Sequence, residues 1–176
     1  MQVTTKAIVF SAIKYGDTSL IVKVFTASDG IKSYLLRGVL SSRKGKLKTA
    51  YFQPLTQLEI VANHRNKGTL ETLREAKVYY HYQSLYADMA KNAMTLFLAE
   101  LLVNSIREEE RNEELFEFLE ASLQWLDVHK DVANFHLYFM LSITKFLGFY
   151  PDVFQIDKPY FDLLEGEFVS VESLNP

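Results

Sequence analysis

The densest group of cationic side chains in this 176-residue chain lies between residues 37 and 49. The segment also contains two glycines and two serines, and its five lysines and arginines are Arg37, Arg43, Lys44, Lys46 and Lys48. Such a loop can follow a phosphate backbone and neutralise it without a fixed geometry. Most charge runs are only solvated surface. Here, however, further cations stand near strand ends, at Lys14, Lys32, Arg65, Lys67 and Arg74, and this spread of charge favours a nucleic-acid surface.

Aromatic side chains of the same half could stack on unpaired bases, an interaction of about 1 to 3 kcal/mol per base. Phe10 and Phe25 stand within apolar alternation and are expected in the core. The candidates for stacking are Tyr15, Tyr34, Tyr51 and Phe52. For these four, stacking and core packing are almost equally supported, because a period of two does not tell which face of a barrel is inside.

A phosphate-binding loop of the nucleotide-hydrolase type is excluded. Six residues separate Gly38 from the Gly45-Lys46 pair where that motif has four, and Leu47 replaces the required serine or threonine.

Metal and nucleophile chemistry also find no support in the residue pattern. The chain has no cysteine, so disulfides, thiolate zinc sites and thiol nucleophiles are excluded. The four histidines are not spaced as metal pairs, and the glutamates between residues 108 and 117 suit a solvated helix start. We therefore expect a non-catalytic protein without cofactor or metal.

The first 78 residues show the pattern of short strands. Turn signals at residues 15–17, 28–30 and 66–68 separate strands that we expect at residues 6–13, 19–26, 31–37, 57–62 and 69–78. Five short strands without an intervening helix predict a small barrel or a strongly bent sheet.

After Tyr79 the apolar period changes from two to 3.6. Helices are expected at residues 83–107, 113–126 and 135–147, the first buried centrally with an inward stripe through Leu85, Met89, Ala93, Leu96, Glu100 and Val103. Asn112 is expected to cap the second helix, and Gly148 and Pro151 to end the third. Residues 160–171 could form a hairpin that turns at Glu165-Gly166. The prediction is an all-β module followed by an α-helical bundle.

Charge changes sign at the same place. Residues 1–78 carry 13 basic and 5 acidic side chains, a net charge of +8, whereas residues 79–176 carry 6 and 17, a net charge of −11. We therefore predict domains at 1–78 and 79–151 and a tail at 152–176. The chain lacks a secretory signal pattern and an apolar run of membrane-spanning length, which favours the cytoplasm.

Several segments, in this order, resemble the RecO family of bacterial recombination mediators. They are residues 15–22 (YGDTSLIV), Phe25-Thr26 with Gly30, the basic segment 37–48, residues 53–55 (QPL) with Leu58-Glu59, Leu70 with residues 73–76 (LREA), and residues 147–151 (LGFYP). The resemblance implies an N-terminal five-stranded OB-fold that binds DNA, followed by a helical domain.

The resemblance also implies a function in DNA repair and homologous recombination. Members of this family bind single- and double-stranded DNA, anneal complementary strands, and with RecR help RecA to replace the single-strand-binding protein SSB. The resemblance would also place the protein in the cytoplasm in association with the nucleoid. In some relatives the helical domain docks the acidic tail of SSB, and the cations that could do so here are Lys91, Arg107, Arg111, Lys130 and Lys145. Many relatives have a cysteine zinc site after the Gly-Phe-x-Pro element, but residues 152–157 contain no cysteine.

Three other functions remain open from the residues. An RNA-binding OB-fold module would also need the basic half, and a protein adaptor would use the acidic helices instead. A metal-dependent nuclease would need a carboxylate and histidine constellation, which the sequence does not offer.

Overall fold

The computed structural model describes residues 1–41, 47–65, 70–107 and 110–172. Its elements are the strands β1 (Gln2–Tyr15), β2 (Ser19–Thr26), β3 (Gly30–Leu36), β4 (Gln57–Asn63) and β5 (Thr72–Val78), the short 3-10 helix η1 (Thr49–Phe52), the helices α1 (Met89–Ser105), α2 (Glu113–Val128) and α3 (Phe135–Leu147), and the strands β6 (Tyr160–Asp162) and β7 (Glu167–Val169). The chain divides into two compact units, Met1–Ala133 and Asn134–Pro176. The predicted order of a five-stranded sheet followed by three helices is confirmed, while the predicted domain limits at residues 78 and 151 stay predictions.

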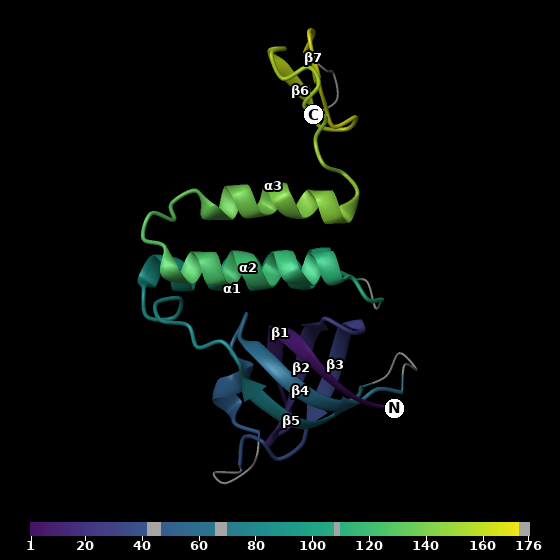
Figure 1. Ribbon diagram of the computed structural model, residues 1–176, viewed down its shortest axis with the longest axis vertical. Helices are drawn as coiled ribbons and strands as arrows, with labels where there is room; N and C mark the ends of the chain where they lie inside the picture. The colour runs from purple at the N-terminus through teal and green to yellow at the C-terminus, as the bar shows by residue number, and fades with distance from the viewer. Residues whose placement is uncertain (42–46, 66–69, 108–109, 173–176) are drawn as a thin grey trace. The chain divides into compact units, whose positions relative to one another are not determined.

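The five strands form one antiparallel sheet in the order β3-β2-β1-β4-β5 (Figure 1). The two outer strands approach each other at one isolated parallel bridge between Tyr34 and Glu71, where Glu71 N donates to Ser33 O at 2.8 Å. The sheet is therefore strongly bent, as the sequence predicts.

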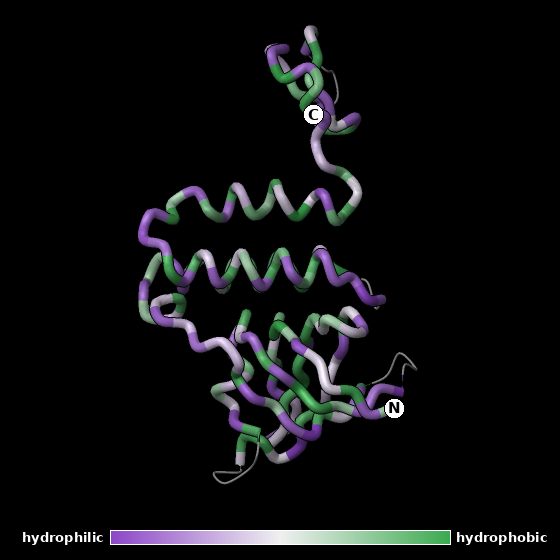
Figure 2. The backbone as a smooth tube through the Cα atoms, in the orientation of Figure 1, coloured by the Kyte–Doolittle hydropathy of each residue, from purple (hydrophilic) through white to green (hydrophobic). Residues whose placement is uncertain are grey.

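Strand β1 is longer than the predicted 6–13, because each of its halves has a different partner. Residues 2–8 pair with β4, and residues 7–15 pair with β2. The strands contain runs of consecutive hydrophobic residues, such as residues 7–10 of β1 and 20–22 of β2, so apolar side chains lie on both faces of the sheet (Figure 2). The inner face buries the core, which includes Ala7, Val9, Val22, Val24 and Leu58.

A β-bulge interrupts β1 at Phe10, where Val9 pairs with Val24 but Ser11 already pairs with Lys23. The Phe10 ring is 1% exposed and stacks on Phe25, with ring centroids 5.8 Å apart. Phe25 in turn stacks on Phe116 of α2 at 6.1 Å. The bulge thus directs an extra aromatic ring towards the helical cover on the outer face of the sheet.

Helix α1 corrects the prediction of a helix from residue 83. Backbone N–H groups of Gln83, Ser84 and Leu85 donate to the Asp127 carboxylate at 2.8 to 2.9 Å, so this segment is held as a loop. The helix begins only at Met89. Its N-cap is Asp88, whose carboxylate accepts a hydrogen bond from Lys91 N. Its buried residues are Lys91, Thr95, Leu98, Ala99 and Leu102, and not the predicted stripe.

The ends of the other helices follow the sequence signals. Asn112 caps α2 by accepting from Leu115 N at 3.0 Å. Helix α3 ends at Gly148, whose φ of 81° lies in the left-handed region that glycine adopts readily. The expected hairpin is present as β6 and β7, and Gly166 N donates to Asp162 O across its turn. None of the helices in the described residues has both the length and the apolar character needed to cross a membrane.

Asp127, near the end of α2, is the main polar anchor between this helix and the segment that leaves the sheet. The residue is 2% exposed, and its backbone carbonyl accepts from Lys91 Nζ at 2.7 Å. Burial alone would raise the pKa of Asp127, but three backbone donors and the Lys91 ammonium outweigh burial and hold the pKa below its ordinary value.

A second set of polar contacts joins α2 directly to the sheet. Glu120 accepts from Lys6 Nζ at 2.8 Å and from the Tyr79 hydroxyl. One turn further, Gln124 Nε2 donates to Gln57 Oε1 at 3.0 Å. These contacts fix the position of α2 along the sheet.

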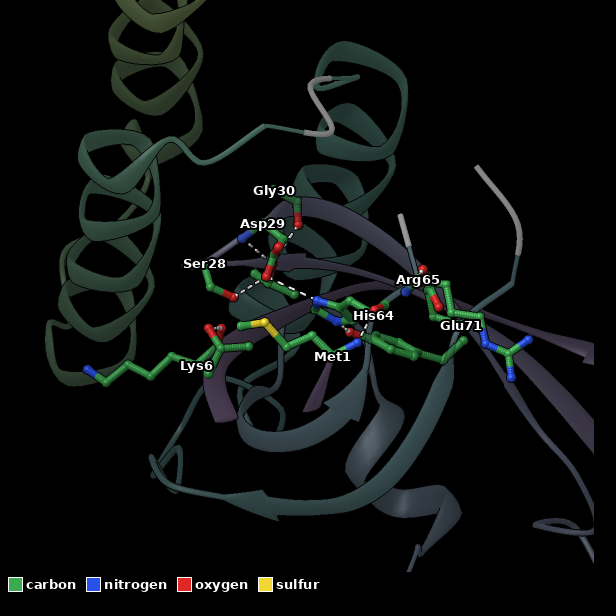
Figure 3. Close-up of polar contacts among 11 residues, drawn as sticks. Met1, Lys6, Ser28, Asp29, Gly30, His64, Arg65 and Glu71 are labelled. Atoms are coloured by element: carbon green, nitrogen blue, oxygen red, sulfur yellow. Dashed lines mark hydrogen bonds and ion pairs between the residues drawn. The ribbon is translucent and has the colours of Figure 1, made fainter. Parts of the chain in front are cut away.

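A buried polar network links the β2–β3 turn to the end of β4 (Figure 3). The Asp29 carboxylate accepts from His64 Nδ1 at 3.0 Å, which assigns the tautomer whose Nε2 accepts from the Tyr34 hydroxyl at 2.6 Å. Burial, with the charges of Asp29 and Glu71, raises the pKa of Tyr34 well above its usual range. Burial alone would raise the pKa of Asp29, but the Ser28 hydroxyl, His64 and Lys32 hold it below its ordinary value.

Replacement of Asp127 by alanine should lower the free energy of unfolding by about 3 kcal/mol, because three backbone donors lose their acceptor, among them the buried Leu85 N–H. Asp127→Ala and wild type are compared by urea unfolding followed by circular dichroism. Since the pKa of Asp127 is lowered from 3.8 in the folded protein, its contribution to stability should be constant above about pH 5 and be lost progressively as the pH falls below that. The exposed Asp131→Ala is the control, with an expected change under about 0.5 kcal/mol. If the difference in free energy of unfolding between Asp127→Ala and wild type already became smaller between pH 7 and 5, this account would be contradicted.

Tyr34→Phe should cost about 1 to 2 kcal/mol of stability, because Nε2 of the buried His64 loses its donor. The measurement is again the urea midpoint. Tyr51→Phe, at a half-buried position outside this network, serves as the matched control and should change stability by less than about 0.5 kcal/mol. Equal effects of the two substitutions would show that the network does not stabilise the sheet.

Candidate nucleic-acid interface

The described ends of the basic segment lie beside the β1–β2 turn. Leu40 N donates to Thr18 O at 2.9 Å, and Thr49 Oγ1 donates to Val39 O at 3.5 Å. Arg37 and Lys48, at the two ends, are exposed. Arg43, Lys44 and Lys46 lie outside the described residues, so their predicted role stays a prediction.

The remaining predicted cations do not form one site. Lys14 is exposed close to the β1–β2 turn, with Arg37 and Lys48. Arg74 is exposed beside the opposite end of β1, where its Nη1 donates to Gln2 Oε1 at 3.2 Å. The two ends of β1 are up to about 40 Å apart at the usual rise per residue. Arg65 is exposed at the Arg74 end, after β4, and Lys67 lies outside the described residues.

Lys32 corrects the prediction of a phosphate contact. It pairs with Val24 on the inner face of the sheet and is only 8% exposed. Its charge acts on Asp29, where it helps to lower the carboxyl pKa. The sequence did not reveal this, because Lys32 has the same type and spacing as a surface lysine.

Two of the four predicted stacking residues are core residues. Tyr34 is 0% and Phe52 is 3% exposed, which corrects the prediction for both. Tyr15 is 57% exposed beside the β1–β2 turn. Tyr51 is half-buried, and Lys48 Nζ lies 5.9 Å from its ring centroid. For Tyr15 and Tyr51 stacking therefore stays a prediction.

Sequence reasoning missed several residues on the outer face of the sheet. The register places Ile13, Ile21 and Leu35 in one row across β1, β2 and β3, with Lys23 in the next row. Side chains at directly paired positions lie on the same face. Ile13 is 64% exposed. A continuous period of two along β1 would have placed Ile13 and Tyr15 inside with Ala7 and Val9, and only the bulge at Phe10 turns them outward.

The cations that were predicted to contact the acidic tail of SSB lie in different surroundings. Lys91 is 5% exposed and donates to Ser84 Oγ at 2.6 Å, which corrects its prediction as a contact residue. Arg107 and Lys130 are exposed, and Arg111 pairs with Glu113 at 2.5 Å. Lys145, in the second unit, lies 4.6 Å from the ring centroid of Tyr150.

The described residues of this surface offer charge and apolar side chains. In the part of the chain that the structure describes, no three histidine, aspartate or glutamate side chains converge as possible ligands. Tyr86, next to the sheet, donates to Pro54 O at 2.9 Å, and burial raises its pKa to about 12. What this surface can do chemically is to neutralise phosphates and pack against bases.

Comparison with known proteins identifies the family. Residues 1–82 match the family model described as recombination protein O N terminal, and residues 86–166 match the one described as recombination protein O C terminal. The DNA repair protein RecO of Flavobacterium johnsoniae is 56% identical over 96% of this chain and 71% of its own length. RecO of Christiangramia forsetii is 56% identical over 98% of the chain and 72% of its own, and that of Porphyromonas gingivalis is 31% identical over 96% and 71%. The chain therefore belongs to the RecO family of DNA repair proteins, which are non-catalytic recombination mediators.

Proposed function

We propose that this protein binds single- and double-stranded DNA, anneals complementary strands and, together with RecR, assists the loading of RecA onto SSB-coated single strands. The observation that carries the proposal is the group of exposed cations Lys14, Arg37 and Lys48 beside the β1–β2 turn, in a chain of the RecO family. The segment between Arg37 and Lys48 adds Arg43, Lys44 and Lys46.

The proposed mechanism needs no bond chemistry. Two complementary strands repel each other through their phosphates, and cations that release counterions from both strands lower that repulsion. Phosphates are the same at every position of a strand, so this attraction does not depend on the base sequence. We assign this role to the first 78 residues, whose net charge is +8.

We assign protein partners to the helical domain, residues 79–151, and the tail. Its net charge with the tail is −11, which disfavours DNA. Exposed cations that could meet the acidic tail of SSB are Arg107, Arg111, Lys130 and Lys145. The Arg111–Glu113 pair is exposed on both sides, so giving it up for a partner costs little.

Affinity for single-stranded DNA should fall steeply with salt. If about four phosphates are neutralised, the slope of log affinity against log salt is about −3. Replacing Arg43, Lys44, Lys46 and Lys48 with alanine should flatten this slope, while Lys14 and Arg37 keep part of it. Fluorescence anisotropy of a labelled oligonucleotide at several salt concentrations measures both slopes.

A matched control removes four cations from the helical domain and tail, Arg107, Lys130, Lys145 and Lys158, and so changes the net charge equally. Its slope should stay near that of wild type. An unchanged slope in the loop variant refutes the role of the segment. Tighter binding of RNA than of DNA of the same sequence would support the RNA-binding alternative, and no binding of either would support the adaptor.

Annealing should depend on the same cations. The loop variant should anneal complementary SSB-coated strands about tenfold more slowly than wild type, because attraction of the second strand is lost. The measurement is the gain of energy transfer between two dyes, one on each strand, with and without RecR. A loop variant that anneals as fast as wild type would contradict the mechanism.

A further inference from the structure

We propose that Tyr82 and Tyr86 are positioning residues for DNA binding, because their hydroxyls hold the turn of residues 53–56 in the conformation that fixes the end of the basic segment at Lys48. This pair of hydroxyls is called the tyrosine clamp. It belongs to the segment between β5 and α1, so it gives the helical region control over the basic segment. The proposal rests on the proposed function and adds a regulation of that site.

The turn of residues 53–56 has an unusual residue at its third position. Thr56 N donates to Gln53 O at 3.1 Å and closes a β-turn. Leu55, the third residue, has a φ of 62°, and it is the one non-glycine residue with a positive φ in the described part of the chain. A positive φ at this position is typical of type II turns, which favour glycine or asparagine there. The leucine therefore needs its surroundings to hold this conformation.

The tyrosines supply hydrogen bonds that hold the turn. Tyr86 Oη donates to Pro54 O at 2.9 Å, and Tyr82 Oη donates to Leu55 O at 2.8 Å. Because the Tyr86 proton is used for Pro54 O, the hydroxyl of Thr56 donates to Tyr86 Oη, 2.9 Å away. The two tyrosine rings meet edge to face, with centroids 5.5 Å apart. Burial raises the pKa of Tyr82 well above its ordinary value and that of Tyr86 to about 12, so both hydroxyls keep their protons at neutral pH.

The central peptide of the turn is an element with two discrete states. Type I and type II turns differ by a rotation of this peptide, which carries Pro54 O and Leu55 N–H. In the observed state Pro54 O accepts from Tyr86, and Leu55 N donates to Val9 O at 2.6 Å. Rotation would break both hydrogen bonds and give Leu55 the negative φ that leucine prefers. The clamp therefore selects the observed state against the preference of Leu55.

The clamp is connected to α2 through the Asp127 carboxylate. Residues 83–85, between the two tyrosines, donate three backbone N–H groups to this carboxylate at 2.8 to 2.9 Å. A partner that moves this segment would therefore move the tyrosine hydroxyls. Coupling between two binding sites is reciprocal, so bound DNA would in turn favour the clamped state.

The turn is connected to the basic surface on two sides. Lys48 directly precedes η1, and η1 directly precedes the turn. Val9 N donates to Thr56 O at 3.0 Å, so the turn also holds β1, the strand that carries Lys14, at the residue before the bulge. Release of the turn would let Lys48 and Lys14 move relative to each other. DNA would then have to order these cations on binding, which lowers its affinity.

The test compares wild type with the double variant Tyr82→Phe/Tyr86→Phe, which loses both hydroxyls and keeps both rings. Anisotropy with a labelled thymidine 20-mer should give a Kd about fivefold higher at every salt concentration, with an unchanged salt slope because no cation is lost. In NMR hydrogen exchange the Leu55 amide should become about tenfold faster relative to that of Val22, in the middle of β2. Tyr79→Phe is the matched control, because its hydroxyl donates to Glu120 and not to the turn, and it should change both readouts by less than about twofold.

A substitution in the turn separates positioning from a merely structural role. Glycine adopts a positive φ readily, so Leu55→Gly in the double variant should bring the Kd back to within about twofold of wild type, although it lowers the urea midpoint further. Leu55→Asn is the second variant if the glycine variant does not fold, since asparagine also tolerates this conformation. Asp127→Ala should raise the Kd to a similar extent and add nothing to the double variant, because both act through the same turn.

An unchanged Kd in the double variant, or a Kd that rises further with Leu55→Gly and with Leu55→Asn, would overturn the positioning role. A Leu55 amide that exchanges no faster than in wild type would overturn the clamp itself. If wild type bound no DNA, the proposed function would fail and the positioning role with it. Amide exchange would then still decide whether the tyrosines hold the turn, which keeps the two failures distinguishable.

Discussion

The β-bulge at Phe10 is the local constraint on which both sides of the sheet depend. Before the bulge, side chains of one parity, Ala7 and Val9, point into the core, and after it the same parity, Ile13 and Tyr15, points outward. The extra residue itself supplies the ring that stacks on Phe25 and, through it, reaches α2. One inserted residue thus determines which side chains of β1 are covered by a helix and which are exposed on the outer face.

Apolar stacking alone would not hold α2 in one position, because apolar contacts are not directional. Hydrogen bonds and an ion pair, which are directional, fix the position of the helix. Glu120 and Gln124 are bound to the sheet, and Asp127 is bound to the segment that leaves it. These groups lose solvation when they are buried, and their hydrogen-bond partners compensate for that cost only in this register. A shift of α2 by one turn would leave Asp127 and three backbone donors unsatisfied.

The features that could be predicted from the sequence are local ones. The limits of β2, the Asn112 cap and the Gly148 end depend on residues a few positions apart. The start of α1 could not be predicted, because the acceptor of the Ser84 backbone N–H is 43 residues away. Burial of Tyr34 depends on its contact with His64, 30 residues further along the chain, and burial of Lys32 depends on its pairing with Val24 on the inner face of the sheet. In the candidate site, residue type identified Tyr15 and the basic loop, whereas Ile13, Ile21 and Leu35 required the register.

The division of charge follows from the same packing. Glu120 is the glutamate of α2 that turns towards the sheet, and it is paired with Lys6 and bound by Tyr79. Glu113, Glu114 and Glu117 are exposed on α2, and β1 to β3 contain no acid that could cancel the cations there. At physiological salt, charges separated by more than about 8 Å are largely screened from each other. The acidic side chains of the helices therefore leave the electrostatic attraction of the basic sheet residues for a polyanion largely in place, and in the proposed function they disfavour DNA on their own surface.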